Sequence, residues 1–383
     1  MRLCQYTIVA VSLLAVCGSL SARATAEDPE RGPQEQAGAR LVRPIDTGLG
    51  LPELLVHGFG HVGYQAEWVD PDDGASRSNN NFVLGGMDLF FSSELAEDFS
   101  FLSETLFEFA GTEVDIDVER LLLLYQVRDW LKFKFGRGHT PIGYWNQRYH
   151  HGRWLQTSLE RPLIFQFDDH GGGLPMHFIG VEVLGDIDAG SGVFSYSVLA
   201  ANGRGDEPGD VQMTEDMNDS KAVGLLLRFA PKLLPGSGFG VNGYLDRVPP
   251  MRNDPARRKS MREYIYGGHV YYEGGAWEFL AEVQWIVHQD RVSDKNHRST
   301  GAYVQLARSF GNWTPYYRFD WLSVADADPF YVGLGETFSD TKQHSVGVRW
   351  DLRSFVAVKL NYRYRDAGGE NGNAIALEAS FAF

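Results

Sequence analysis

Trp277-Glu278-Phe279-Leu280-Ala281-Glu282-Val283-Gln284-Trp285-Ile286-Val287-His288 is the stretch that decides the fold. All of its odd positions are apolar, whereas its even positions include two glutamates, a glutamine and a histidine. Successive side chains of a β-strand point to opposite faces, so this period of two predicts a strand with one apolar and one polar face.

The same alternation separates aromatic from charged residues in three other segments, which are 99–109 (Glu104 and Glu108), 313–321 (Arg318 and Asp320) and 356–364 (Lys359, Asn361 and Arg363). A Lys or Arg side chain that faces the middle of a bilayer costs roughly 2–4 kcal/mol. We therefore expect the apolar faces to contact lipid and the charged faces to line a wet lumen.

Sixteen segments are predicted to be strands, at 54–67, 81–94, 99–110, 114–127, 131–138, 175–186, 192–202, 221–230, 238–247, 262–273, 277–288, 299–309, 313–323, 343–352, 355–365 and 374–383. The even number places both ends of the barrel on the periplasmic side. The fold class is thus all-β, a closed antiparallel transmembrane β-barrel of about 16 strands.

The connections alternate in length. Tight turns at 96–98, 128–130, 274–276, 311–312 and 353–354 alternate with long polar stretches at 68–80, 139–174, 203–220, 248–261, 289–298, 324–342 and 366–373. Short periplasmic turns and long external loops are typical of outer-membrane barrels. A soluble β-sandwich is the alternative, but it has no reason to alternate in this way, and the sequence repeat of a propeller is missing.

The first residues predict export. Met1 and Arg2 precede an apolar run from Tyr6 to Val16 and then small residues, so residues 1–26 are predicted to be a secretory signal peptide cleaved after Ala24 or Ala26. A lipoprotein signal ending at Cys17 is the alternative. Both cysteines, Cys4 and Cys17, lie in this segment, and the mature chain then has no disulfide. Residues 27–53, with four prolines, are predicted to be a periplasmic linker before a barrel at 54–383.

Composition narrows the function further. The formal net charge of −15 over 383 residues argues against general nucleic-acid binding. After the signal, no apolar run reaches the roughly 20 residues that a membrane helix needs. A content of 13% aromatic residues and 43 glycines suits a barrel with aromatic belts and a polar lumen.

The last predicted strand alternates Ile375, Leu377, Ala379 and Phe381 up to a terminal Phe383. This pattern resembles the C-terminal signal by which outer-membrane barrels are recognised for assembly. It implies location in the outer membrane of a Gram-negative bacterium, with membrane lipid and the barrel assembly machinery as partners.

At the level of architecture the whole mature chain resembles the sixteen-stranded porins, including the phosphate-selective porin O and P group, whose binding residues find no match here. In porins the loop after the fifth strand folds inward and narrows the pore. The corresponding loop is 139–174, and its aromatic residues need to be buried. We expect its constriction residues to be Tyr144, Trp145, Arg148, Arg153, Arg161, Asp168 and Asp169. A loop that caps the outer mouth is the alternative.

Charges on the predicted lumen wall are segregated. An acidic wall is expected from Glu104, Glu108, Asp117 and Glu119, and a basic wall from Arg318, Arg349, Lys359, Arg363 and Arg365. Opposed charge clusters orient dipolar solutes, and a basic wall favours anions. Lys132 and Lys134 dilute the pattern.

No catalytic or cofactor motif stands out. His139, His150, His151, His170 and His177 cluster in the sequence, but without defined ligand spacing, so no metal site is predicted. Asp115, Asp117 and Glu119 alternate without the oxygen ligands that calcium needs. The sequence therefore predicts a passive porin for small hydrophilic solutes that is not an enzyme and has no cofactor. The oligomeric state is left open, and a homotrimer is one option because porin-like barrels are often trimers. An enzyme on the barrel, such as a phospholipase, is an alternative that would need a Ser/His pair facing lipid, and the spacing singles out no such pair. A plugged, non-conducting barrel with a binding or structural role is the alternative.

Overall fold

The computed structural model describes residues 52–71, 76–110, 113–150, 152–168, 171–210, 213, 216–251, 253–332, 334, 338–367 and 370–383. The predicted signal peptide and the linker up to residue 51 lie outside the described residues, as do His151, Asp169 and His170.

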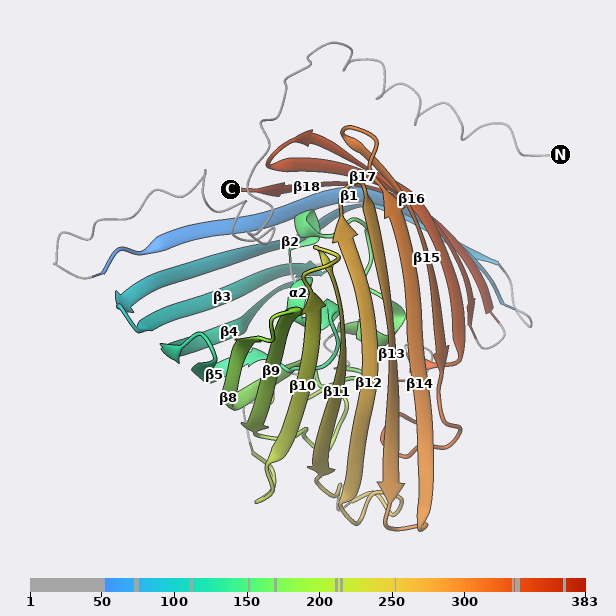
Figure 1. Ribbon diagram of the computed structural model, residues 1–383. Coiled ribbons are helices and arrows are strands. Elements are labelled where there is room, and N and C mark those ends of the chain that lie inside the picture. Colours follow the sequence, from blue (N-terminus) through green and yellow to red (C-terminus); the bar gives the residue numbers. More distant parts are fainter. Residues whose placement is uncertain are drawn as a thin grey trace.

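Sixteen strands form one closed antiparallel barrel, in which each strand pairs with its neighbours and β1 pairs with β18 (Figure 1). The strands are β1 (Leu55–Pro71), β2 (Arg77–Ala96), β3 (Phe99–Ala110), β4 (Glu113–Arg128), β5 (Leu131–His139), β8 (His177–Asp188), β9 (Gly192–Ala201), β10 (Ala222–Pro231), β11 (Ser237–Val248), β12 (Met261–Gly274), β13 (Trp277–Asp290), β14 (Lys295–Arg308), β15 (Trp313–Ser323), β16 (Thr341–Arg353), β17 (Val356–Ala367) and β18 (Glu370–Ala382). The predicted fold class is confirmed, and each of the predicted segments overlaps one of these strands.

Three of the predicted long loops are wrong in extent. β1 and β2 continue until only 72–76 separates them, β13 and β14 leave 291–294, and β17 and β18 leave 368–369. Strands pair through backbone groups, so a hairpin can continue beyond the membrane, where its side chains no longer need to alternate. The alternation of apolar and polar residues therefore no longer predicts the strand beyond the membrane. The long connections that remain are 140–176, 202–221, 249–260 and 324–340.

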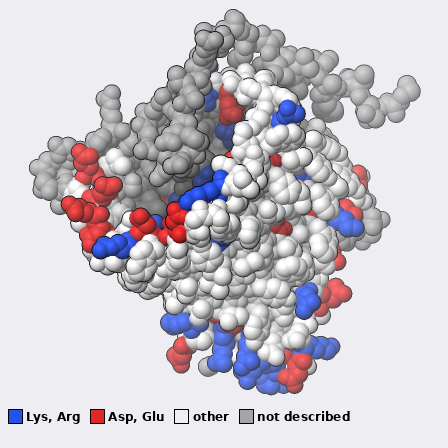
Figure 2. All heavy atoms as spheres, viewed as in Figure 1, with Lys and Arg blue, Asp and Glu red and all other residues white. Residues whose placement is uncertain are grey.

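The wall is apolar outside and polar inside, as the alternation predicts. On β17, Leu360 and Tyr362 are exposed, whereas Lys359 and Asn361 are buried. Few charged residues lie on the middle of the face shown in Figure 2. Lys, Arg, Asp and Glu are concentrated at its lower end and beside the hollow. No described helix is long and apolar enough to cross a membrane.

Backbone hydrogen bonds close the barrel at its seam. The Gly58 amide donates to the Phe383 carbonyl (2.8 Å), and the Phe383 amide donates to the Gly58 carbonyl (2.9 Å). A Cβ at position 58 would lie 2.7 Å from the Phe383 ring, so this glycine lets the terminal ring approach β1.

Candidate pore and its internal loop

The chain between β5 and β8, residues 140–176, is called the lumen loop, because its described residues (all but 151, 169 and 170) lie inside the barrel. It contains the short helix α2 (Trp145–Arg148), two 3₁₀ turns (Arg153–Leu155 and Leu163–Phe165) and a separate two-stranded sheet, β6 (Phe167–Asp168) with β7 (Gly171–Gly172). Its apolar side chains share one buried cluster with inward-facing residues of β8–β15, including Tyr244, Ile265, Leu280, Tyr303 and Leu322.

Carboxylates of the wall hold the first part of the lumen loop. The backbone amides of Tyr144 and Trp145 donate to the Glu282 carboxylate on β13 (2.6 and 2.8 Å), and the Tyr303 hydroxyl donates to it as well (2.6 Å). The Tyr144 hydroxyl donates to Glu273 (2.6 Å). Tyr144 and Trp145, predicted at the constriction, are therefore buried anchors of the loop.

Cationic side chains of the predicted basic wall hold the second part by its carbonyl oxygens. Arg318 pairs with Asp320 (2.8 Å) and donates to the carbonyls of Glu160 (2.6 Å) and Arg161 (3.0 Å). Lys359 donates to the carbonyls of Arg153 and Ser158, the latter at 3.1 Å.

Arg349 does the same from β16, donating to the carbonyls of Trp154 and Gln156, the latter at 2.9 Å. Arg318, Lys359 and Arg349 thus lie on the lumen side of the wall, but they contact the loop backbone and do not line the open space. The reason is chemical: the loop brings carbonyl dipoles to each cation, and the wall itself supplies carboxylates, Asp320 to Arg318 and Asp351 to Arg349.

Arg363 is the member of this basic wall that borders open space. It donates to Glu160 of the loop (2.7 Å) and to Glu67 of β1 (2.6 Å). Burial raises the pKa of Glu160, but the guanidinium groups of Arg363 and Arg318 outweigh it and hold this pKa below its usual range. Glu160 is therefore an ionised carboxylate. Arg365 is half-buried further along β17.

A cavity of about 540 Å³ lies between the lumen loop and the wall formed by β1–β4, β17 and β18. Carboxylates on β2–β4 line one side, namely Asp88, Glu108, Asp117 and Glu119. The lumen loop, β17 and β18 contribute both signs, namely Arg153, Arg161 and Arg363 with Glu160 and Glu378. The cavity is therefore lined by carboxylates alone on β2–β4 and by paired charges elsewhere.

The other predicted residues lie away from this cavity. Glu104 is fully buried in an ion pair with Arg120. Arg148 ends α2 and is half-buried. Asp168 belongs to the short strand β6, and Asp169 lies outside the described residues. Asp88 was missed, although its place one step from Leu89 on an alternating strand marks it as inward-facing.

A second inward packing lies beside the start of β12 and the end of β13. The ring of His288 lies between the carboxylates of Glu263 (3.0 Å) and Asp328 (2.8 Å), and Asp328 belongs to the connection 324–340. The guanidinium groups of Arg204 and Arg257 lie 5.2 and 5.0 Å from the centre of the Phe330 ring. External connections thus pack into the same half of the lumen that the loop aromatics fill.

No protein-family model and no curated protein matches the chain. Solved structures do match in fold. The chain has the fold of a bacterial outer-membrane porin. The anion-selective porin from Comamonas acidovorans superposes with a TM-score of 0.60 at 12% identity, over 86% of this chain and 100% of that one.

Two further porin-fold structures match similarly. The outer membrane channel DcaP of Acinetobacter baumannii has a TM-score of 0.58 at 11% identity, over 88% of this chain and 98% of that one. Salmonella typhi OmpF, solved with daunomycin, has a TM-score of 0.58 at 11% identity, over 89% of this chain and 100% of that one. These neighbours are outer-membrane proteins of Gram-negative bacteria, and identity this low shows the porin fold alone.

Proposed function

We propose that the protein is a passive outer-membrane porin, and that small hydrophilic solutes pass along the cavity between the lumen loop and β1–β4. The observation that carries the proposal is this hollow, charged space beside a loop that is fixed to the opposite wall. Hydrogen bonds from wall side chains keep the loop from closing or leaving the lumen. A water-filled, charged path is what polar solutes need to cross a bilayer.

The preference for anions that the basic wall suggested loses its basis, because Arg318, Arg349 and Lys359 are bound to the loop. Carboxylates outnumber guanidinium groups along the cavity, since Glu160 and Glu378 join the four on β2–β4. Glu160 and Glu378 are paired with Arg363 and Arg153. We therefore propose a weak preference for cations. Phosphate should be one of the anions whose permeability is compared with that of cations.

Single-channel recording on the purified full-length protein in a planar bilayer tests the pore. We expect stepwise, ohmic conductance. Replacing Arg363 and Arg365 together by Gln should shift the reversal potential further toward cations. A folded barrel that never conducts would overturn the porin proposal in favour of a plugged barrel. The apolar packing of the lumen loop against β8–β15 is the observation that favours this alternative.

Assembly is part of the same proposal. Vibrio cholerae OmpT, which has a similar fold at a TM-score of 0.51, was solved in a trimer form. We propose a homotrimer here, inserted in outer-membrane lipid by the barrel assembly machinery through a signal that includes Phe383. Cross-linking of the protein in native membranes should yield a trimer band, and a monomer alone would contradict it. No catalytic role is proposed.

A further inference from the structure

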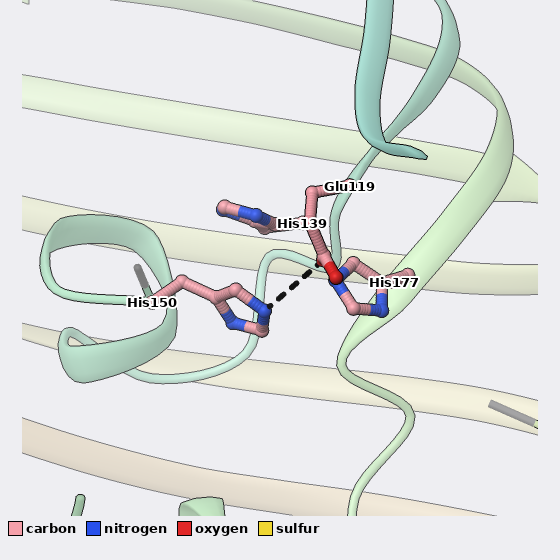
Figure 3. A group of neighbouring side chains, drawn as sticks. All are labelled: Glu119, His139, His150 and His177. Atoms are coloured by element: carbon pink, nitrogen blue, oxygen red, sulfur yellow. Dashed lines mark ion pairs between the residues drawn. The ribbon is translucent and has the colours of Figure 1, made fainter. Parts of the chain in front are cut away.

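Four side chains that can bind metal meet at one point inside the barrel: Glu119, His139, His150 and His177 (Figure 3). Each offers one ligand atom, and these atoms all lie within 4.8 Å of one another. We propose that this cluster binds one divalent transition-metal ion, for which Zn²⁺ is the best fit. Neither the sequence spacing nor the porin fold predicts such a site.

The barrel and the lumen loop assemble the cluster together. His139 is the last residue of β5 and lies opposite His177, the first residue of β8, in the pairing of these strands. Glu119 lies on β4 where the register with β3 shifts, because Glu104 pairs with Arg120 and the next residue pairs with Val118. An irregularity of this kind re-aims a side chain, and Glu119 points into the lumen. His150 is brought by the lumen loop.

The ligand chemistry suits zinc. Imidazole nitrogens and carboxylate oxygens both bind zinc, with bonds of about 2.0–2.2 Å, so the ligand atoms of a tetrahedral site lie about 3.4 Å apart. His150 Nε2 lies 3.7 Å from Glu119 Oε2, and His177 Nε2 contacts the same carboxylate oxygen. The His139 and His150 rings have centroids 4.0 Å apart. Shifts of about an ångström would bring all four atoms onto one ion, and Zn²⁺ is among the first-row ions that suit imidazole ligands.

An outer hydrogen bond prepares His150 for coordination. The Asn146 side-chain amide donates to the carbonyls of Thr140 (3.0 Å) and Met176 (3.1 Å), which fixes its oxygen on the other side. That oxygen lies 2.6 Å from His150 Nδ1. His150 Nδ1 therefore carries the proton, and the lone pair of Nε2 points toward Glu119. Metal-binding histidines are held in this way by an acceptor on their other nitrogen.

The site can be reached, although it is buried. Glu119 and His150 both line the cavity, which gives an ion a route from solution. Arg137 and Arg161 also act electrostatically on Glu119, so the carboxylate is balanced by cationic groups before an ion arrives. Binding must outweigh this balance, which favours a doubly charged ion with several strong ligands over Na⁺ or K⁺.

A bound ion would tie the lumen loop, through His150, to three neighbouring strands. An effect of the ion on the pore rests on the proposed function, because the ion would fix one border of the solute path. The metal site itself does not depend on the proposed function. Metal binding is therefore measured separately from conductance. A barrel that binds zinc but never conducts supports the metal site and contradicts the porin proposal. A barrel that conducts but binds no zinc supports the porin proposal and contradicts the metal site.

The test is a metal titration of the purified, folded full-length barrel in detergent after treatment with a chelator. We expect one Zn²⁺ per chain by calorimetry and elemental analysis, and the visible absorption of tetrahedral Co²⁺ when cobalt replaces zinc. His177→Ala and Glu119→Gln should each abolish stoichiometric binding, whereas His297→Ala, a histidine of β14 outside the cluster, should not change it.

Folding of each variant is checked by its migration in an unheated detergent gel. If His177→Ala does not fold, Asn146→Ala is the second variant, because it leaves all four ligands in place. We expect Asn146→Ala to weaken Zn²⁺ binding by about 10–100-fold, as loss of an outer-shell partner does. No zinc at one equivalent in the wild-type barrel, or zinc affinity unchanged by these substitutions, would overturn the proposal.

Discussion

The wall of β8–β15 and the wall of β1–β4 face the same lumen loop, yet the two contacts differ in kind. Against β8–β15 the loop buries aromatic and aliphatic side chains, with Trp145 and Phe165 almost completely enclosed. Against β1–β4 it leaves a cavity of about 540 Å³ with charged groups on both sides. We call these the packed half and the hollow half. The difference shows that one loop both stabilises the barrel interior and shapes the open path.

The same substitution in both halves should have unequal effects on stability. Arg318 is fully buried with Asp320 in the packed half, so Arg318→Met strands a buried carboxylate and several loop carbonyls. We expect the free energy of unfolding to fall by roughly 3–5 kcal/mol. Arg363 borders the cavity, where Glu67 is 42% exposed and its other partner Glu160 is 19% exposed, so Arg363→Met should cost less, about 1–3 kcal/mol.

Urea titration followed by tryptophan fluorescence measures both losses. Arg318→Lys is the matched control, since it keeps the charge while losing the planar fork that reaches several acceptors. Equal losses for the two Met variants would show that the division into packed and hollow halves has no energetic meaning.

Packing density offers a second comparison with a smaller effect. A Cβ added at Gly301 of β14 would lie 2.5 Å from the Ile164 side chain of the loop, whereas one added at Gly243 of β11 meets nothing within 4 Å. Gly301→Val should therefore lower the free energy of unfolding by roughly 1–3 kcal/mol. Gly243→Val should leave it unchanged or raise it slightly, because valine favours strands. Thermal unfolding measures both, and an unaffected Gly301→Val barrel would mean that the loop is loosely held.

How much the sequence predicts depends on whether a residue faces lipid. The alternation around Trp285 and Leu360 is readable because the bilayer demands an apolar outer face, and it leads to the sixteen strands. The partners of Arg318 and Lys359 are backbone carbonyls, which every residue possesses, so no pattern predicts them. Glu119 was assigned to the acidic wall, since nothing in the sequence shows the register shift or the histidine that the loop brings to it.

The seam between β1 and β18 borders the hollow half, and it should depend on strand pairing more than on packing. Phe383 is 45% exposed, so Phe383→Ala removes the burial of about half a ring and should lower the free energy of unfolding by about 1 kcal/mol. Phe383→Tyr is the control, because it keeps the ring. If Phe383 also serves in assembly, the amount of folded barrel in the membrane should fall more than stability alone explains. Equal membrane levels of the Ala and Tyr variants would contradict that role.

Substitutions of the cavity carboxylates should have the smallest effect on the free energy of unfolding and the clearest effect on ion selectivity. Glu108 and Asp117 line the hollow half, and the pair Glu108→Gln with Asp117→Asn should change the free energy of unfolding by no more than about 0.5 kcal/mol, because Glu108 is exposed to the cavity. Loss of two negative charges beside the path should move the reversal potential in a salt gradient toward anions. Glu278→Gln is a change of the same kind in the packed half and should leave the reversal potential unchanged. Glu278 does not line the cavity and instead accepts hydrogen bonds from Thr157 and Gln305. If Glu278→Gln shifted the potential and the double variant did not, ions would cross on the other side of the lumen loop, and the halves would have to exchange their roles.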